Sequence, residues 1–179
     1  MFLRTLGSID EAELHSKKVH LVETPIFFVG VFVAHDFEVD ERNRCQLPHS
    51  DLTERVIAAF YAVHAELGYG FSESVYRRAT ALVLRQDGLE AIEEQSITVV
   101  FRETLIGTFQ ADIVVAGVVL VEIKAAATIG NYAQAQILNY LKAAGGGVGL
   151  LLNFGRQAIF KRFVMGDPTN SLPALRAPR

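Results

Sequence analysis

The spacing of apolar residues along this chain predicts two helices first. Residues 51–67 and 72–86 repeat their apolar positions every three or four residues, and glycines follow both stretches. We expect Asp51 to cap the first helix, with Glu54 reaching back as in a capping box. In the second helix we expect an apolar inner face and a basic outer face. The inner set is Val75, Ala79, Leu82 and Val83, and the outer set is Arg77, Arg78 and Arg85.

Beyond residue 94 the pattern changes to short apolar and β-branched runs that are typical of strands. The expected strands cover residues 96–101, 108–115, 118–124, 148–154 and 158–164. Tight turns are expected at residues 102–104 and 116–117, and a third helix over residues 128–144. The order ααβββαββ predicts an α/β fold in which helices cover a central mixed sheet.

The first 49 residues do not continue this pattern. Residues 25–34 form an apolar run that is too short for a membrane-spanning helix, and acidic residues precede it, unlike in a secretory signal. The charged stretch 36–50 is typical of a linker. We therefore expect an N-terminal extension over residues 1–49, one domain over 50–165, and a disordered tail over 166–179.

Composition and charge narrow the classes of function. The 179 residues are 50% hydrophobic and 21% charged, which is typical of a globular protein. The single cysteine, Cys45, excludes an internal disulfide framework and favours a reducing, cytoplasmic location. The net charge of −3 excludes a protein that coats nucleic acid by bulk charge. Residues 1–49 carry 8 acids and 5 bases, which leaves 12 of each in the rest of the chain.

Three charged residues interrupt the apolar strands. Glu122 and Lys124 end one apolar run, and strand alternation places both on the same face. Asp112 stands in the preceding run at a similar distance from the turn, so we expect it beside Glu122. An exposed ion pair at a strand end is the simple alternative. Two adjacent, poorly hydrated carboxylates favour a divalent cation, however, and we predict Mg²⁺ or Mn²⁺ there, with Lys124 assisting a water or a phosphate.

Asp112 and the pair Glu122-x-Lys124 resemble the catalytic signature of the PD-(D/E)xK nuclease superfamily. The proline that gives the superfamily its name is absent, because Ala111 precedes Asp112. The resemblance implies a restriction-endonuclease-like α/β/α sandwich around a mixed sheet. It also implies hydrolysis of phosphodiester bonds in DNA, or in RNA, with Mg²⁺ or Mn²⁺ as cofactor.

A second motif narrows this resemblance. Gly70, Glu73 and Tyr76 are spaced as in the motif of the GxxExxY protein family, which belongs to the same superfamily. The segments 135–141 and 151–155 are also similar to that family, and the motifs stand in the expected order. The likeness covers about residues 51 to 164.

The resemblance implies a role for each matching position. Asp112, Glu122 and Glu73 match the metal-binding acids, Lys124 the catalytic lysine, and Gln136 a glutamine on the helix after the core strand. Glu73 also stands at the start of a helix, where the helix dipole alone favours an acid. No matching catalytic position is lost, so nothing in the resemblance indicates an inactive enzyme.

Two tyrosines and several basic residues have weaker assignments. Tyr76 is expected to pack in the core with its hydroxyl satisfied. Tyr140 lies four residues after Gln136 on one helical face, and the two side chains can form a hydrogen-bond pair without touching substrate. Candidate phosphate contacts, most of them expected to be solvated surface, are Arg77, Arg78, Arg102, Arg156, Lys161 and Arg162.

The main alternative function is a non-catalytic module on a nuclease-like fold that binds nucleic acid or protein. The neutral charge of the domain and the lack of a dense basic stripe favour this alternative. The apolar segment 26–33 would then dock a partner, such as a second copy in a homodimer. Calorimetry with Mg²⁺ or Mn²⁺ separates the alternatives, because only the enzyme requires a metal site.

Overall fold

The computed structural model describes residues 48–166 and Leu172. Its elements are α1 (Ser50–Leu67), α2 (Glu73–Gln86), β1 (Ala91–Phe101), β2 (Thr104–Val115), β3 (Val119–Lys124), α3 (Asn131–Ala144), β4 (Gly147–Phe154) and β5 (Ala158–Met165). The predicted order and the α/β class are confirmed. The predictions for the N-terminal extension, including the apolar run at 25–34, lie outside the described residues, as do those for most of the tail.

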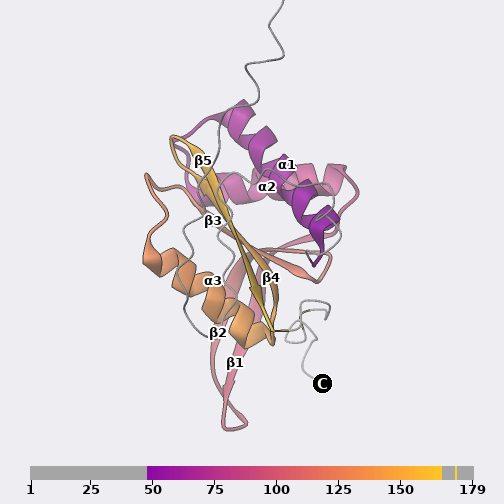
Figure 1. Ribbon diagram of the computed structural model, residues 1–179, viewed down its shortest axis with the longest axis vertical. Helices are drawn as coiled ribbons and strands as arrows, with labels where there is room; N and C mark the ends of the chain where they lie inside the picture. The colour runs from indigo at the N-terminus through magenta and orange to yellow at the C-terminus, as the bar shows by residue number, and fades with distance from the viewer. Residues whose placement is uncertain (1–47, 167–171, 173–179) are drawn as a thin grey trace, which may run out of the picture.

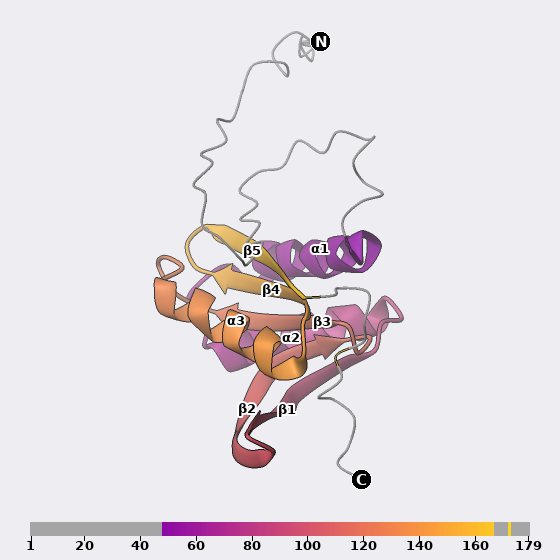
Figure 2. The same cartoon turned by 60° about the horizontal axis from the view of Figure 1, so that its bottom comes forward.

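The five strands form one mixed sheet in the order β1-β2-β3-β4-β5. β3 and β4 run parallel, and the other neighbouring strands run antiparallel. Helices α1 and α2 cover one face of the sheet and α3 covers the other (Figures 1 and 2). This arrangement is the predicted α/β/α sandwich, and it buries β4 along its whole length.

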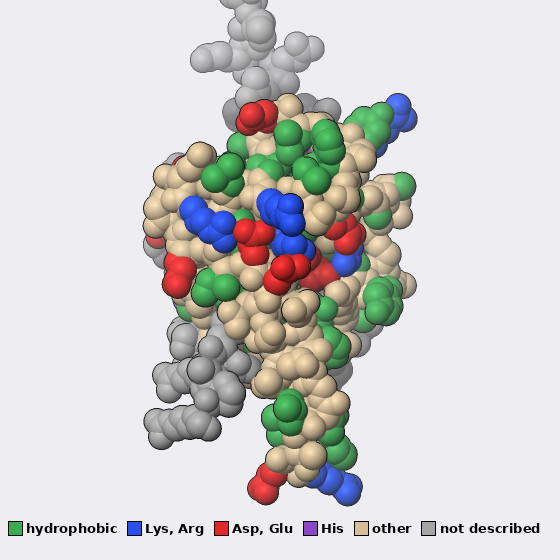
Figure 3. All heavy atoms as spheres, turned by 180° about the vertical axis from the view of Figure 1, so that it is seen from behind, with side chains coloured by type: hydrophobic (Ala, Val, Ile, Leu, Met, Phe, Trp, Pro, Cys, Tyr) green, Lys and Arg blue, Asp and Glu red, His purple; other side chains and the backbone are tan. Residues whose placement is uncertain are grey.

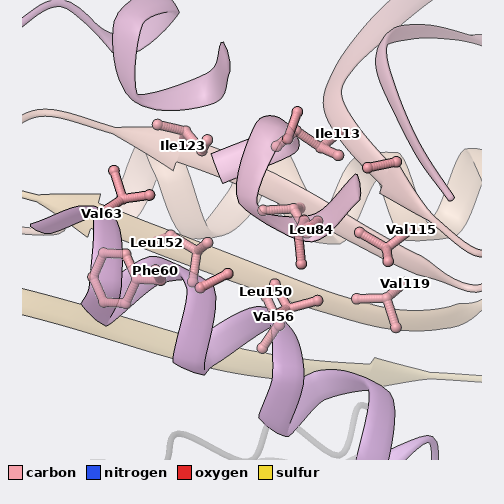
Figure 4. Close-up of a cluster of buried hydrophobic side chains, with 14 of the residues drawn as sticks. Val56, Phe60, Val63, Leu84, Ile113, Val115, Val119, Ile123, Leu150 and Leu152 are labelled. Atoms are coloured by element: carbon pink, nitrogen blue, oxygen red, sulfur yellow. The ribbon is translucent and has the colours of Figure 1, made fainter. Parts of the chain in front are cut away.

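The larger hydrophobic cluster lies between the sheet and the pair α1 and α2 (Figure 4). It includes Val56 and Phe60 of α1 and Leu84 of α2, which pack on strand residues such as Leu150. A second cluster joins α3 to the opposite face of the sheet. Leu172 belongs to this second cluster, and its backbone N–H donates to Gly117 O. Both faces of the central strands are therefore closed to water.

The expected start of α1 is wrong by one residue. The helix begins at Ser50, and its N-cap residue, His49, has a left-handed φ of 54° and makes no side-chain cap hydrogen bond. Asp51 lies inside the first turn and does not cap the helix. An acid remains favourable at this position, because the first turn is the positive end of the helix dipole.

The expected inner face of α2 is wrong in part: Ala79 and Val83 are half-buried against the core as expected, but the other two predicted residues are not. Val75 and Leu82 are exposed, and the buried residues are Tyr76, Thr80, Ala81 and Leu84. The Tyr76 ring stacks on Phe154 at 4.3 Å between centroids, which turns this face of the helix toward the sheet. Arg77 moves inward with it, so its predicted outward position is wrong: only 14% of its side chain is exposed.

The first two strands are longer than expected. β1 begins at Ala91 rather than at residue 96, and β2 begins at Thr104 rather than at residue 108. They form a hairpin whose tip projects away from the body of the molecule (Figures 1 and 2). The turn residues Arg102 and Glu103 both have positive φ, 48° and 63°, as the tightest hairpin turns require.

Candidate active site

Glu122 and Lys124 lie at the end of β3. Glu122 is a carboxylate with only 2% of its surface exposed. Its Oε1 accepts a hydrogen bond of 2.6 Å from Lys124 Nζ, while its Oε2 is buried and has no hydrogen-bond partner among the described residues. A buried carboxylate is stable only when its oxygens are satisfied. Glu122 therefore has one buried oxygen without a partner among the described residues, near the end of the central strand β3.

Asp112 stands next to Glu122, on the neighbouring strand. The antiparallel register ends where Ile113 of β2 pairs with Val121 of β3, so Asp112 and Glu122 come one residue beyond the last pair, and the charge of Asp112 raises the pKa of Glu122. One Asp112 oxygen, Oδ2, accepts a hydrogen bond of 2.7 Å from the backbone N–H of Ile123. The two carboxylates that the sequence singled out thus come together at one end of the sheet.

Glu73 reaches this point from a different element. It is the first residue of α2, and its Oε1 accepts a hydrogen bond of 3.4 Å from the backbone N–H of Ala125, directly after β3. The side chain of Asn153 holds the next residue, because its amide both accepts from Ala126 N and donates to Ala126 O, each at 2.9 Å. Gly155 is equally constrained, since a Cβ there would stand 2.2 Å from Ala126 O. The segment after β3 is therefore fixed on two sides.

Burial and mutual repulsion raise the pKa of both acids. Burial raises the pKa of Glu122 to about 7, the Lys124 hydrogen bond opposes this shift, and the negative charge of Asp112 adds to it. Burial also raises the pKa of Asp112, although the Ile123 N–H and the charges of Lys124 and Arg77 lower it in part. Burial alone would lower the pKa of Lys124, but the hydrogen bond and charge of Glu122, with the other two acids, raise it. Lys124 is therefore a cation at neutral pH.

The donor set fits a hard divalent cation. The charges of Asp112 on β2 and Glu73 on α2 both raise the pKa of Glu122 on β3, so the three acids lie near one another. The Oε2 of Glu122, which has no partner among the described residues, is an oxygen that such an ion would satisfy. Among the residues that the structure describes, however, no group of three or more His, Cys, Asp or Glu side chains is arranged so that it could hold a metal ion. The three acids therefore have the oxygen-ligand chemistry that Mg²⁺ or Mn²⁺ prefers, but their side chains do not form a complete ligand set.

Comparison with known proteins places this chain in a family. The sequence model of the PD-(D/E)XK nuclease superfamily matches residues 50–163. The chain belongs to this superfamily. A comparison with curated proteins gives no match. Among solved structures, the chain is similar to the one titled "Crystal structure of SSO0001", at 17% identity with a TM-score of 0.43, over 71% of this chain. The match spans 64% of that protein's length.

The other predicted residues of this PD-(D/E)XK protein have clear partners. Gln136 Nε2 donates to Tyr140 Oη at 2.7 Å, as the sequence spacing allowed. Burial raises the pKa of the Tyr140 hydroxyl, and the charge of Glu122 adds to this shift, so the pair lies near the acids. The Tyr76 hydroxyl donates to Gly68 O and accepts from Phe71 N. Tyr76 thus has the structural role expected for it, since it fixes the loop before Glu73.

The inward position of Arg77, beside this nuclease-like site, was not predicted from the sequence. Arg77 pairs with Glu94 at 2.9 Å and Glu93 at 3.6 Å, and its Nη1 lies 3.8 Å from Asp112 Oδ1. Its position four residues after Glu73, hence on the same helical face, was the available signal. Arg162 is buried and donates to Pro48 O, so it is not placed to contact a phosphate from the surface.

None of the helices that the structure describes in this superfamily member has the length and hydrophobicity needed to cross a membrane.

Proposed function

We propose that this chain is a nuclease that hydrolyses phosphodiester bonds of DNA and depends on Mg²⁺ or Mn²⁺. The observation that carries the proposal is the state of Glu122. One of its oxygens is held by Lys124, and the other is buried without a partner in the described part of the chain, within the field of a second carboxylate, that of Asp112. A purely structural ion pair would satisfy both oxygens. An acid that binds a cation needs an oxygen that no other group already satisfies.

Each residue has a distinct part in this proposal. Asp112, Glu122 and Glu73 would hold the cation, and Lys124 would stabilise the negative charge that develops on the phosphate. When bound, the divalent cation would polarise the phosphate and acidify the attacking water. Gln136 lies one helical turn before Tyr140 and would help to place the substrate. The Lys124 ammonium is already oriented by Glu122, so little reorganisation precedes the reaction.

The same site supports two narrower assignments. We infer membership of the GxxExxY family within the superfamily from Gly70, Glu73 and Tyr76 and from the segment 151–155. Tyr76 fixes the loop and Asn153, within that segment, fixes the residues after β3, which gives both motifs a structural reason. DNA is the proposed substrate and RNA the alternative.

The test is cleavage by the full-length chain across duplex, single-stranded and branched DNA and RNA, with Mg²⁺, Mn²⁺ or EDTA. We expect cleavage only with a divalent cation. The Asp112→Asn variant should lose both cleavage and the calorimetric heat of Mn²⁺ binding, while Asp87→Asn, an exposed acid at the end of α2, should keep both. Unchanged cleavage in Asp112→Asn would contradict the proposal.

A non-catalytic binding module is the second candidate, and the projecting hairpin favours it. Val100, Phe101, Leu105 and Ile106 are large apolar residues that are all exposed near its tip. Such a surface is typical of a site for another macromolecule. Absence of calorimetric metal binding, together with no cleavage of any substrate, would favour this candidate over the enzyme.

A further inference from the structure

Several exposed aromatic side chains of the described residues stand close in sequence to the acids or to Gln136. Six Phe and Tyr side chains are exposed: Tyr61, Tyr69, Phe71, Phe101, Phe109 and Tyr132. Of these, Tyr61 lies on α1 against Phe160 and Phe101 lies at the hairpin tip. The remaining four lie on segments that lead directly into the carboxylate site, so they form a group that the site's own chemistry does not explain.

Tyr69 and Phe71 lie on the side of the site formed by Glu73. Both belong to the loop between α1 and α2, and Phe71 comes two residues before Glu73. The loop is fixed, because the Tyr76 hydroxyl bonds to Gly68 O and Phe71 N. The Arg156 guanidinium lies 6.0 Å from the centre of the Tyr69 ring. This side therefore presents two rigid aromatic faces, one with an accompanying positive charge.

Phe109 and Tyr132 lie on the side formed by α3 and β2. Phe109 comes three residues before Asp112 on β2, and its ring lies 5.0 Å from that of Tyr140. Tyr132 stands one helical turn before Gln136, which in turn bonds to Tyr140, so the three α3 residues form one stripe. Tyr132 is 84% exposed at the outer end of this stripe. The stripe leads from solvent to the acids.

The cations near the acids are largely committed to them. Arg77 pairs with Glu93, Glu94 and Asp112, and Lys124 pairs with Glu122. On the face shown in Figure 3, Lys and Arg side chains stand among Asp and Glu side chains and form no continuous row. Binding of duplex DNA depends mainly on rows of cations that contact phosphates. The surroundings of the site offer aromatic faces instead.

Aromatic side chains reach the faces of bases only where the bases are not stacked in a duplex. Stacking on protein rings is the usual source of affinity for single strands, and it tolerates any sequence. We propose that the substrate of this site is an unpaired nucleic-acid strand whose bases stack on Tyr69 and Phe71 on one side of the acids and on Phe109 and Tyr132 on the other. This inference rests on the proposed nuclease function.

The test measures binding separately from cleavage. The fluorescence anisotropy of a labelled 20-nucleotide strand is followed with the full-length chain in EDTA, against the same sequence as duplex DNA. We expect the single strand to bind at least about tenfold more tightly, and Phe71→Ala and Tyr132→Ala each to weaken its binding about 5- to 20-fold. Phe71→Tyr should restore the affinity, because it keeps an aromatic face.

Tyr61→Ala is the matched control, since Tyr61 is an exposed aromatic residue on α1, a helix that carries none of the acids. It should leave single-strand binding unchanged. An RNA strand of the same sequence should bind within a few-fold of DNA, because stacking uses bases and not sugars. Tenfold discrimination between RNA and DNA, equal binding of the duplex, or Phe71→Ala and Tyr132→Ala variants that behave like Tyr61→Ala would each overturn the inference.

Failure of this inference can be distinguished from failure of the nuclease proposal. Single-strand binding that depends on Phe71 and Tyr132, without cleavage in Mg²⁺ or Mn²⁺, supports the inference and removes the nuclease function. Metal-dependent cleavage of duplex DNA that is unchanged in Phe71→Ala and Tyr132→Ala keeps the nuclease function and overturns the inference.

Discussion

The end of β3 and the tip of the β1–β2 hairpin depart in opposite ways from the usual separation of polar and apolar residues. At the end of β3, the charged side chain of Glu122 is almost completely buried. At the hairpin tip, Val100, Leu105 and Ile106 are each 61% exposed to water. The first departure takes a charge out of water, and the second leaves apolar surface in it.

The two regions differ in how many elements hold them. The acids at the end of β3 are fixed by contacts from β2, α2 and the segment after β3. The hairpin tip is held by the pairing of its own two strands, with a register shift between Val99 and Val100. A charge that several elements keep buried points to a site, whereas an apolar surface that only its own hairpin holds points to a partner. Substitutions in the two regions should therefore have very different effects.

The largest effect is expected for Lys124→Ala. Loss of the ammonium removes the charge that would stabilise the phosphate, and we expect cleavage to fall about 100- to 1,000-fold. The fold should persist, because Glu122 can take up a proton when its partner is removed. Cleavage rates in Mn²⁺ measure the effect, with Lys142→Ala, an exposed lysine on α3, as the control. Equal rates for the two variants would show that the end of β3 is not a catalytic site.

The free energy of unfolding of the Glu122→Gln variant tests how much the buried charge of Glu122 destabilises the protein. The pKa of Glu122 is raised to about 7 in the folded protein. The protonated Glu122 therefore stabilises the fold fully below the ordinary glutamate pKa, and this stabilisation is lost as the pH rises through about 7. In EDTA at pH 8, Glu122→Gln should be more stable than wild type by roughly 1 to 3 kcal/mol. Urea denaturation at pH 5 and pH 8 measures this, and the gain should be much smaller at pH 5.

A Glu122→Gln variant that is less stable than wild type at pH 8 would contradict the account of a strained, buried carboxylate. Added Mn²⁺ gives an internal control. It should stabilise the wild type, in which the carboxylates can bind it, more than the variant.

Arg77→Met should have an intermediate effect, because it removes the ion pairs that link the candidate active site to the base of the hairpin. Arg77 links α2 to Glu93 and Glu94 of β1 and to Asp112 of β2. Methionine keeps much of the packing volume, and we expect a loss of about 1 to 2 kcal/mol in unfolding free energy. The pKa of Asp112, which Arg77 lowers, should rise, so metal binding should require a higher pH.

Thermal unfolding and calorimetric titration of Mn²⁺ at several pH values measure the two consequences. Arg78→Met is the matched control, since the neighbouring arginine on α2 is exposed. If both variants behave alike, Arg77 does not connect the hairpin to the site.

The hydrophobic pattern predicts elements best where burial is uniform. β4 is expected to within one residue, because an apolar strand buried on both faces carries the same signal at every position. The first five residues of β1 are missed, since Glu93, Glu94 and Gln95 are polar. Ion pairs from Arg77 and Arg85 hold this part of the strand, and they depend on where α2 packs. A local pattern does not contain that information.

The site shows the same limit. Asp112, Glu122 and Lys124 stand out in the sequence because charges interrupt apolar strands, and strand alternation places the last two on one face. The inner face of α2 is a different matter, because a tertiary contact, the stacking of Tyr76 on Phe154, sets its rotation. That rotation is what brings Arg77 to Asp112. Sequence alone therefore singles out the acids, but it does not predict that the Arg77 guanidinium lies beside Asp112.

The smallest effect is expected at the hairpin tip, for Val100→Thr combined with Leu105→Thr. These residues pair across the two strands and are both exposed, and threonine keeps a high strand propensity. The unfolding free energy should change by less than about 0.5 kcal/mol, as for other surface substitutions. Ile97→Val, in the buried part of the same hairpin, should cost about 1 kcal/mol. Urea denaturation compares them, and a loss above 1 kcal/mol at the tip would mean that these side chains pack within the folded chain rather than await a partner.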